Sequence, residues 1–397
     1  MTLRGRRIAV INWRDLDHSL AGGSERYAWE CARAFVAEGA HVDFLTARDA
    51  GQSARGGSEG IHVVRAGGRF TFYPRVWAKL LWRRVVRPYD LVVDAENGIP
   101  VFAPLVVGRR TKVLLVVHHV HLDQFLTYFP WLLAQLGRWL EGWVMPRVYR
   151  RVRTIAVSES THVEMVEQLG WDQPVEIVRN GTVEPDVSTR VPAAGPSSLV
   201  VLGRLATHKR VDLVIRAVEA LRATRPDITL DIVGSGPDEP MLHQLVEQLG
   251  LSGVVRFHGH VTEREKYAVL QQARLHVSAS DIEGWGQVVI EAASVGVPTL
   301  ARDVPGLRES IRSGETGWLV DEPDADLRGV AARLVTHIEA ALVELADDDE
   351  RAEISRACQK WSAQFTWSEM HRQLRHLAEQ ELGCASSEPP VSQRLAS

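Results

Sequence analysis

Short apolar runs alternate with longer amphipathic segments along most of the chain. The runs are rich in Val, Ile and Leu, as in the buried strands of parallel sheets, and the segments between them place apolar residues three and four positions apart, as in helices. In the first half the expected strands are RIAVIN, HVDFLT, IHVVRA, YDLVVDAEN, KVLLVVHH, TIAVS and VEIVRNG. In the second half they are SLVVLGRL, ITLDIVGSG, VVRFHGHV, ARLHVSAS, VPTLARD and GWLV, with helices expected over 211–224, 239–249 and 287–294. The pattern predicts an α/β protein with two doubly wound, Rossmann-like parallel-sheet domains.

The alternation stops over residues 182–198, where TVEPDVSTRVPAAGPSS is rich in proline, serine and alanine. Such a composition without a period is typical of an interdomain linker. We therefore expect an N-terminal domain, a linker and a C-terminal domain over residues 1–185, 186–198 and 199–365. The chain is expected to be mainly helical over 324–382, to return to the first domain from about residue 366, and to be disordered over 384–397. Two such domains facing each other would form one interdomain cleft, because parallel sheets bind ligands at the carboxyl ends of their strands.

Composition narrows the class of protein. The chain has 397 residues, of which 45% are hydrophobic and 24% charged, as expected for globular domains. Its formal net charge of −4 argues against a general attraction to nucleic acid. The three cysteines, Cys31, Cys358 and Cys384, lie far apart without a CxxC pair, so neither a zinc site nor a disulfide framework is indicated. Neither a signal peptide nor an apolar run of about 18 residues is present, and we expect a cytoplasmic protein.

The segment LGRLATHK places Gly203, Arg204 and Lys209 just after an expected strand. Two cations beside a glycine that lets a ligand approach the backbone suit a diphosphate, whose negative charge must be compensated when a bond to it breaks. A basic loop that pairs with neighbouring acids is the alternative.

The segment SDIEGWGQVVIEAASVGVP places Glu283 in a loop after another expected strand, and Glu291 one turn into the helix that follows. Carboxylates accept hydrogen bonds from sugar hydroxyls, and the free N–H groups at a helix start attract anions or hydroxyl oxygens. The alternative is an acid that caps the helix and a second one that faces solvent.

These two segments, continued by VPTLARDVPGLRE and GETGWLV, closely resemble the nucleotide-sugar-binding half of family 4 glycosyltransferases, which are retaining enzymes of the GT-B fold. Glu283 and Glu291 match the spacing of that family's E-x7-E motif. The resemblance implies that Arg204 and Lys209 hold the donor diphosphate and that Glu291 takes the ribose hydroxyls. It implies that Glu283 holds the donor sugar together with the backbone after it, at Gly284, Trp285, Gly286, Gln287 and Val288. The family's glycine-rich turn, which lines the nucleotide base, corresponds to Gly234 and Gly236.

The first half carries the same resemblance. GGSERYAWECARAF resembles the family's glycine-rich loop and helix, so Gly22 and Gly23 are expected to bring backbone close to the diphosphate or acceptor, with Ser24 as a plausible N-cap. A simple tight turn is the alternative. AVSES and RNGT fall where the family has equivalent pieces, which makes Ser158 and Asn180 acceptor-side candidates.

Three histidines, His118, His119 and His121, follow the expected strand KVLLVV. A histidine at a strand end can donate a hydrogen bond or exchange a proton near neutral pH, or can simply cap the strand. A metal site is disfavoured, because this spacing from one loop lacks the acidic or sulfur partners that zinc usually adds. The family has one histidine here that faces the donor sugar; His118 is our choice, with His119 second and also an acceptor-side candidate.

Two acidic triplets, Asp15–Asp17 and Asp324–Asp326, spell the DxD of metal-dependent glycosyltransferases of another fold. Such triplets arise by chance among 50 acidic residues, and Arg204 and Lys209 already offer a metal-free way to stabilise the leaving group. We expect no obligatory metal or other cofactor.

The stretch from Trp131 to Arg153 is an aromatic, amphipathic segment that ends in a cluster of arginines. Packing inside the domain is the favoured interpretation. The alternative is peripheral contact with an anionic membrane at the inner face, where a lipid-linked acceptor would be met.

Together these features predict a retaining glycosyltransferase that moves a sugar from a nucleoside diphosphate donor to a hydroxyl acceptor, which is lipid-linked, a glycan or a small molecule. Two alternatives stay open: a GT-B-shaped epimerase or phosphorylase, against which the E-x7-E spacing argues, and a sugar-nucleotide-binding protein without catalysis.

Overall fold

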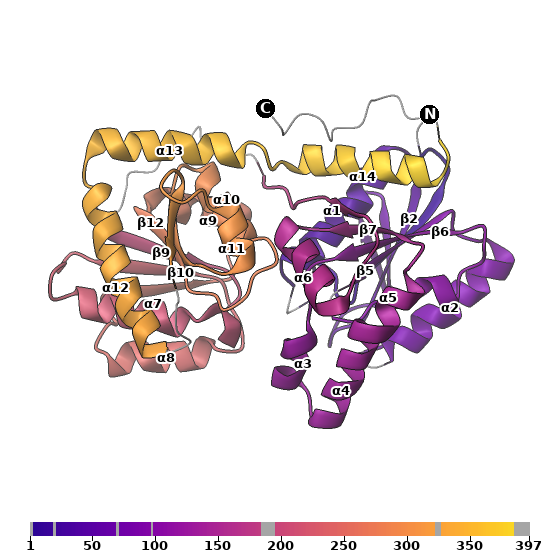
Figure 1. Ribbon diagram of the computed structural model, residues 1–397, viewed down its shortest axis with the longest axis horizontal. Coiled ribbons are helices and arrows are strands. Elements are labelled where there is room, and N and C mark those ends of the chain that lie inside the picture. Colours follow the sequence, from indigo (N-terminus) through magenta and orange to yellow (C-terminus); the bar gives the residue numbers. More distant parts are fainter. Residues whose placement is uncertain are drawn as a thin grey trace. The chain divides into compact units, whose positions relative to one another are not determined.

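The computed structural model describes residues 3–18, 21–68, 71–96, 98–183, 195–321 and 327–384. The chain divides into two compact units (Figure 1): unit 1 comprises Met1–Arg179 and Trp367–Ser397, and unit 2 comprises Asn180–Thr366. Most of the expected linker and the expected tail from 385 to 397 lie outside the described residues. The last residue assigned to the linker, Ser198, begins the first strand of unit 2.

Unit 1 is built on an eight-stranded sheet with the order β3-β4-β2-β1-β5-β6-β7-β8. All seven predicted strands are present, and they pair in parallel. The extra strand β3 pairs antiparallel with β4 at the edge; its sequence, RGGS, has no apolar alternation from which a strand could be predicted. The strands are β1 (Arg7–Ile11), β2 (His41–Thr46), β3 (Arg55–Ser58), β4 (Ile61–Arg65), β5 (Leu91–Glu96), β6 (Lys112–Val117), β7 (Arg153–Ala156) and β8 (Val175–Ile177).

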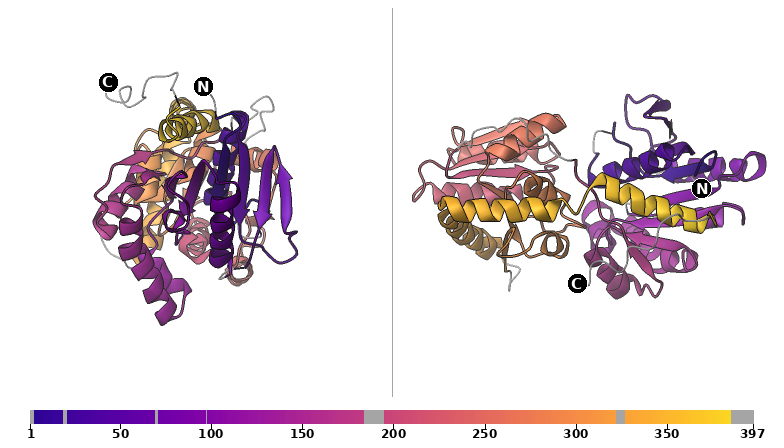
Figure 2. Two further views of the ribbon diagram at one scale, coloured as in Figure 1. Left: turned by 90° about the vertical axis from the view of Figure 1, so that its right-hand side faces the viewer. Right: turned by 90° about the horizontal axis from the view of Figure 1, so that it is seen from above.

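Helices cover this sheet, and the one from the end of the chain joins them. They are α1 (Gly23–Ala37), α2 (Phe72–Val86), η1 (Ala103–Leu105), α3 (Leu122–Tyr128), α4 (Trp131–Trp139), the π-helical η2 (Leu140–Val144), α5 (Met145–Val148), α6 (Glu159–Leu169) and α14 (Trp367–Glu381). The yellow α14 lies along α1 in both figures (Figures 1 and 2). It buries Met370 and Leu374, and the ring Nε2 of His371 lies 2.9 Å from a carboxylate oxygen of the buried Glu30.

Unit 2 is built on a six-stranded parallel sheet with the order β11-β10-β9-β12-β13-β14. Its strands are β9 (Ser198–Leu202), β10 (Thr229–Val233), β11 (Val255–Gly259), β12 (Leu275–Ser278), β13 (Thr299–Arg302) and β14 (Gly317–Val320). Its helices are η3 (Thr207–Lys209), α7 (Val211–Leu221), α8 (Glu239–Gln248), α9 (Glu263–Gln272), α10 (Gln287–Ser294), α11 (Pro305–Ser310), α12 (Leu327–Glu344) and α13 (Asp348–Ser362). Each sheet has its own buried hydrophobic core. The prediction of two doubly wound parallel sheets, the architecture of the GT-B fold, is confirmed.

The strand order of unit 2 reverses between β9 and β12. From β9 the chain moves outward to β10 and β11, and it then returns to β12 on the other side of β9. In open parallel sheets ligands bind at such a reversal, just beyond the carboxyl ends of the strands. The loops that follow β9 and β12 are those that carry Arg204, Lys209 and Glu283.

The expectation that the Trp131 segment packs inside the domain is wrong. Trp131 and Leu132 are 68% and 73% exposed, and Trp139 and Trp143 are half exposed. The inward positions of α4 are taken instead by small residues, because Gly137 lies against the ring of Phe125. Among the described residues, no helix combines the length and apolar character that crossing a bilayer requires.

Candidate functional site

Lys209 and Glu283 face each other where the strand order of unit 2 reverses. Lys209 ends η3, which follows β9, and its Nζ forms an ion pair with Oε1 of Glu283, in the loop after β12. The Ser280 hydroxyl donates to the same oxygen at 3.1 Å. A small pocket beside the pair is lined by backbone of both strand ends and by Arg204. The structure thus brings Glu283 together with Arg204 and Lys209, which precede it by more than 70 residues.

The charges in this group are set by burial and pairing. Burial alone would raise the pKa of Glu283, but Lys209 and the Ser280 hydroxyl favour the carboxylate and hold its pKa below the usual range. Burial lowers the pKa of the neighbouring His208 and of His276, on β12, to about 4, with the charge of Lys209 acting in the same direction. Near neutral pH the site therefore holds one carboxylate and two cations beside uncharged imidazoles.

Two glycines fix the turn that carries Arg204. A Cβ at Gly234 would lie 1.9 Å from the carbonyl oxygen of Gly203, and a Cβ at Gly236 would lie 2.2 Å from that of Leu205. The two turns are also joined by hydrogen bonds, from Gly203 N to Val233 O at 3.0 Å and from Leu205 N to Ser235 O at 3.0 Å. The backbone contact explains why both positions lack a side chain, independently of any nucleotide.

The loop from Glu283 to Gly286 is held in place by close packing. Trp285 is 4% exposed and packs edge-on against Phe365, with 5.0 Å between ring centroids. Gly286 has a φ of +67° and caps α10, and a Cβ there would lie 2.5 Å from the Ser310 hydroxyl. A Cβ at Gly306 would lie 2.1 Å from the carbonyl oxygen of Glu283. The tryptophan is an anchor, and the first turn of α10, which carries Gln287 and Val288, has a fixed position.

Glu291 is buried against a lysine of its own. The Nζ of Lys266, on α9, lies 3.1 Å from Oε1 of Glu291, and Gln287 Nε2 donates to the same oxygen at 3.3 Å. Lys266 also pairs with Glu263, so Glu291 shares this lysine. Burial lowers the pKa of Lys266, but the charges of Glu291 and Glu263 together outweigh it and raise that pKa. For Glu291 burial outweighs the shared cation and keeps its pKa above the usual range. Sequence reasoning missed Lys266, because nothing in its local pattern distinguishes it from an exposed lysine.

Asn180 was expected on the acceptor side but is the first residue of unit 2. Its side-chain amide donates to Oε1 of Gln287 at 3.0 Å. Asn180 is buried and extends the group of polar side chains at the start of α10.

His118 directly follows β6 in unit 1 and is buried against Tyr27, with 5.1 Å between ring centroids. Burial lowers its pKa to about 3. The idea that it exchanges a proton near neutral pH is therefore wrong, since the ring is neutral there. Its Nε2 has no hydrogen-bond partner among the described residues, which leaves a neutral imidazole able to contact a ligand.

The start of α1 already holds an acid. Gly22 is the N-cap and Gly23 begins the helix, so the prediction of Ser24 as N-cap is wrong. The Gly22 N–H donates to Oε2 of Glu25 at 2.7 Å, and Arg14 pairs with Oε1 of the same residue at 2.8 Å. Both glycines are exposed, but the carboxylate of Glu25 occupies the place that an anion would take at a helix start.

The other acceptor-side candidates have structural contacts. Ser158 is fully buried and caps α6, its hydroxyl oxygen accepting from Thr161 N at 2.9 Å. That contact argues against direct acceptor binding by Ser158. His119 stacks on His121 with 3.8 Å between ring centroids and is partly exposed.

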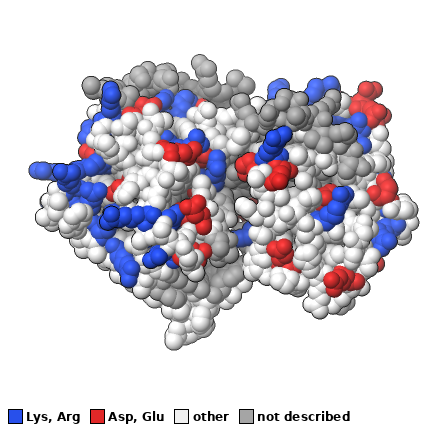
Figure 3. All heavy atoms as spheres, turned by 180° about the vertical axis from the view of Figure 1, so that it is seen from behind, with Lys and Arg blue, Asp and Glu red and all other residues white. Residues whose placement is uncertain are grey.

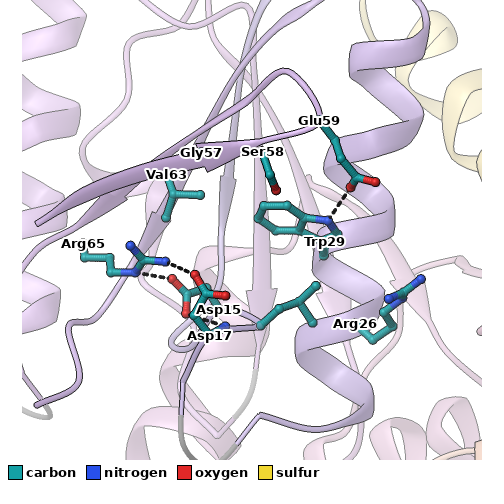
Figure 4. A pocket seen from close by; sticks show the side chains of 10 residues that line it. Asp15, Asp17, Arg26, Trp29, Gly57, Ser58, Glu59, Val63 and Arg65 are labelled. Atoms are coloured by element: carbon teal, nitrogen blue, oxygen red, sulfur yellow. Dashed lines mark hydrogen bonds and ion pairs between the residues drawn. The ribbon is translucent and has the colours of Figure 1, made fainter. Parts of the chain in front are cut away.

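A cavity of about 320 Å³ lies in unit 1 around the first DxD triplet (Figure 4). The side chain of Arg65 reaches both acids, with 2.5 Å to Asp15 and 2.6 Å to Asp17, and across the cavity Trp29 donates to Glu59 at 3.0 Å. An arginine therefore occupies the position in which a metal would bind this triplet. The second triplet, Asp324–Asp326, lies outside the described residues.

Two family models match the two halves of the chain in order. The model described as Glycosyltransferase Family 4 matches residues 21–183, and the one described as Glycosyl transferases group 1 matches residues 190–347. Among curated proteins, a glycogen synthase of Mycobacterium tuberculosis is 27% identical over 393 residues, with 91% of each chain covered. A D-inositol 3-phosphate glycosyltransferase of Thermobispora bispora is 27% identical over 293 residues, which cover 60% of this chain and 66% of that protein.

Solved structures share the fold over nearly the whole chain. A sucrose-phosphate synthase of Thermosynechococcus elongatus superposes with a TM-score of 0.78 at 22% identity, covering 95% of this chain and 99% of the other. A glycosyltransferase of Rickettsia africae gives a TM-score of 0.71 at 16% identity, covering 96% and 100%.

Proposed function

We propose that this protein, a glycosyltransferase of the GT-B fold that transfers a sugar from a nucleotide-sugar donor, is a retaining hexosyltransferase whose donor site is built around Lys209 and Glu283. The observation that carries the proposal is the partly buried ion pair of these residues at the strand-order reversal of unit 2. A cation held by a carboxylate there is pre-oriented for a leaving diphosphate.

The role that we propose for each residue follows from its charge. Arg204 and Lys209 stabilise the negative charge that builds up on the departing diphosphate, so no metal ion is needed at that step. Glu283 receives its two side-chain contacts on Oε1, and its other oxygen accepts hydrogen bonds from hydroxyls of the donor sugar. Glu291, held by Lys266, accepts from the ribose hydroxyls, while Gln287 and Asn180 order the backbone beside them.

His118 is proposed to contact the donor sugar. Because its pKa is about 3, it acts as a neutral hydrogen-bonding group and supplies no proton at neutral pH. No side chain is assigned as a covalent nucleophile. The acceptor hydroxyl attacks the same face from which the diphosphate leaves; the bond from the sugar to the diphosphate breaks as the new glycosidic bond forms, and an oxygen of the departing diphosphate takes the hydroxyl proton. NMR of the first product formed tests this stereochemistry: an anomeric configuration equal to that of the donor is expected, and the inverted configuration would overturn retention.

Thermal stabilisation by nucleotides tests the donor site. Solved GT-B structures with similar folds contain UDP, so UDP and its sugars are tested first, beside GDP, ADP and TDP. A ligand at 100 times its Kd raises the free energy of unfolding by about 2.7 kcal/mol, which shifts Tm by several degrees. The shift should vanish in Lys209→Ala and persist in Lys360→Ala, an exposed lysine of α13.

The rate of sugar transfer provides a second test of the proposed donor site. Lys209→Ala should lower kcat by about 10²- to 10³-fold, as expected for the loss of one group that stabilises charge in the transition state. Added Mg²⁺ should leave the wild-type rate unchanged. Near-normal turnover in Lys209→Ala, or a rate that depends on added Mg²⁺, would contradict the proposed role of the two cations.

We further propose that unit 1 contacts an anionic membrane surface, where a lipid-linked acceptor would be met. An exposed apolar ridge runs along α4 and η2, and exposed arginines follow it. The ridge comprises Trp131, Leu132, Leu133, Leu136, Trp139 and Trp143, and the arginines are Arg147, Arg150 and Arg151. In Figure 3 the end of α4 is the uncharged protrusion at the lower edge. Tryptophan beside arginine suits the headgroup level of a bilayer.

The ridge is also ordered internally. The rings of Trp139 and Trp143 stack 5.7 Å apart at 14°, and the guanidinium of Arg147 lies 3.9 Å from the Trp143 ring centroid. Sedimentation with vesicles rich in phosphatidylserine should bring down the wild type but not Trp131→Glu/Leu132→Glu. Val343→Glu, an equally exposed apolar position of unit 2, should bind as the wild type does. Equal sedimentation with neutral and anionic vesicles, or binding by the double variant, would contradict the surface.

A further inference from the structure

Three side chains meet inside unit 1, apart from the proposed donor residues of unit 2. Glu96 is the last residue of β5, His121 directly precedes α3, and Glu141 lies in η2. All three are buried, with exposures of 0%, 8% and 0%. One ligand atom of each lies within 4.8 Å of the other two. The sequence hides this group, because its members lie 20 or more positions apart.

The distances fit a bound ion better than hydrogen bonds. His121 Nδ1 lies 3.4 Å from Oε1 of Glu96 and 3.4 Å from Oε1 of Glu141. Hydrogen bonds from nitrogen to oxygen are about 2.7–3.2 Å long. Two ligands of a tetrahedral ion bonded at about 2.0–2.2 Å lie about 3.3–3.5 Å apart.

The polar atoms of the group are unsatisfied. In the part of the chain that the structure describes, His121 Nδ1, Glu96 Oε2 and Glu141 Oε2 are buried without a hydrogen-bond partner. An unpaired buried polar atom costs about 1–3 kcal/mol, so three such atoms in one group of side chains require an explanation. A ligand bound between them supplies one.

Backbone groups hold the two carboxylates in place. Gly98 N donates to Oε1 of Glu96 at 2.5 Å, and His121 N donates to Oε1 of Glu141 at 2.7 Å. Metal-binding carboxylates usually receive such outer hydrogen bonds, which orient them toward the ion. Glu141 is also the buried side chain of a π-helical segment, a feature frequently found at functional sites.

The charges of the two carboxylates also favour a bound cation. Among the described residues neither Glu96 nor Glu141 forms an ion pair with lysine or arginine. A divalent cation would neutralise both carboxylates beside a neutral imidazole. The alternative to a bound cation is protonation of the carboxylates, because burial raises the pKa of Glu96 well above its usual range and that of Glu141 to about 8.

We propose that Glu96, His121 and Glu141 bind one divalent transition-metal ion, which anchors the loop that carries His118 and His119. Imidazole with two carboxylates suits Zn²⁺ and Mn²⁺, whereas Mg²⁺ prefers oxygen ligands and usually keeps several waters. The reason for disfavouring a metal at these histidines was the lack of acidic partners nearby, and the fold supplies two from elsewhere in the chain. The ion has a structural role and takes no part in stabilising the diphosphate.

Metal content is the first test. Untagged wild-type protein, purified without chelators, should contain close to one Zn or Mn per chain by inductively coupled plasma mass spectrometry. Glu141→Gln should lose most of it. Glu164→Gln should retain it, because Glu164 contacts the same loop, through Val120 N at 3.4 Å, from outside the group. Metal-free wild-type protein that also takes up neither Zn²⁺ nor Mn²⁺ on incubation would overturn the proposal, as would retention of a full equivalent by Glu141→Gln.

Measurements of stability and spectroscopy distinguish a bound metal ion from carboxyl groups that are protonated instead. Prolonged chelation should lower Tm by about 5 °C or more, and Zn²⁺ or Mn²⁺, but not Mg²⁺, should restore it. Glu141→Gln should have the low Tm without chelation; wild-type Tm in this variant would favour protons, because an amide replaces a carboxylic acid at equal volume. Co²⁺ added to the chelated wild type should give the intense visible bands of a tetrahedral site, and weak octahedral bands would overturn the geometry. None of these measurements depends on donor binding by Lys209 and Glu283.

Discussion

At the residue scale, the proposed site pairs each of two glutamates, one partly buried and one buried, with a lysine. Glu283 has Lys209, and Glu291 has Lys266, which it shares with Glu263. Buried ion pairs add little net stability, because the desolvation of both charges offsets their attraction. Their value here is orientation: each carboxylate is held in one direction with lone pairs left for hydroxyl groups. Loss of either lysine would raise the pKa of its glutamate, because burial would then act without the opposing cation.

His276 gives a residue-scale prediction about pH. It is fully buried on β12, bonded through Nδ1 to Thr299 at 3.0 Å, and burial lowers its pKa from 6.5 to about 4. The nearby charges act on it in opposite directions, since Glu283 raises the pKa and Lys209 lowers it. The unfolded chain takes up this proton near pH 6.5 and the folded chain near pH 4, so the free energy of unfolding falls as pH drops through this window.

His276→Asn removes this titration. Between pH 7 and pH 5 the free energy of unfolding of the wild type should fall by about 2 kcal/mol more than that of the variant, as measured by chemical denaturation at both pH values. His41→Asn, at an exposed position of β2, serves as the control and should behave as the wild type does. Identical losses in His276→Asn and the wild type would show that His276 is not the group responsible.

The sequence was informative about single residues when a motif surrounded them. Glu283 and Lys209 could be placed near each other because each follows a predicted strand and parallel strands end at the same edge. Lys266 and the Glu96, His121 and Glu141 group could not be found, since their contacts depend on how separate helices and loops pack. The exposure of Trp131 was also missed, because an apolar helix face gives the same pattern whether it is covered or not.

At the element scale, unit 2 depends on backbone-to-backbone contacts at its glycine turns. The turn after β10 approaches the turn after β9 so closely that Gly234 and Gly236 have no room for a Cβ. Helix and strand positions followed from apolar periodicity, and β7 through β14 lie where predicted. The turn geometry did not follow, because a glycine in the sequence does not reveal which backbone approaches it.

Gly234→Ala tests this contact. Its Cβ would lie 1.9 Å from the Gly203 carbonyl oxygen at a φ of +133°, so the two turns must separate. We expect a loss of about 3 kcal/mol or more in the free energy of unfolding, and weaker nucleotide binding because the Arg204 turn moves. Gly253→Ala has open space around it and should stay within about 1 kcal/mol of the wild type. An equal free energy of unfolding in both variants would contradict the close contact between the two turns.

At the scale of the whole molecule, the two units differ in how the chain builds them. Unit 2 is one continuous stretch, whereas unit 1 needs α14 from beyond unit 2. Helix α14 buries apolar side chains against α1, and Arg375 pairs with Glu38 at 2.9 Å while Arg153 pairs with Glu381 at 2.9 Å. The helix thus belongs to the core of unit 1.

Leu374→Ala should therefore weaken unit 1 and leave unit 2 unchanged. Leu374 is fully buried, so its truncation should cost about 2–5 kcal/mol. Hydrogen exchange followed by mass spectrometry should show faster exchange in α1 and β2, with α7 and β10 as before. Val163→Ala, half exposed on α6, provides the control in the same unit. Faster exchange spread evenly over both units would contradict the assignment of α14 to unit 1.

The return of α14 also fixes an order of events on the ribosome. Residues 180–366 precede α14 along the chain and leave the ribosome before it does, so unit 2 can fold while unit 1 still lacks a helix. The half that is synthesised first is then the half completed last. A message truncated ahead of residue 367 would yield a complete unit 2 joined to a unit 1 in which the apolar face of α1 is uncovered, a product that cellular proteases would recognise and remove.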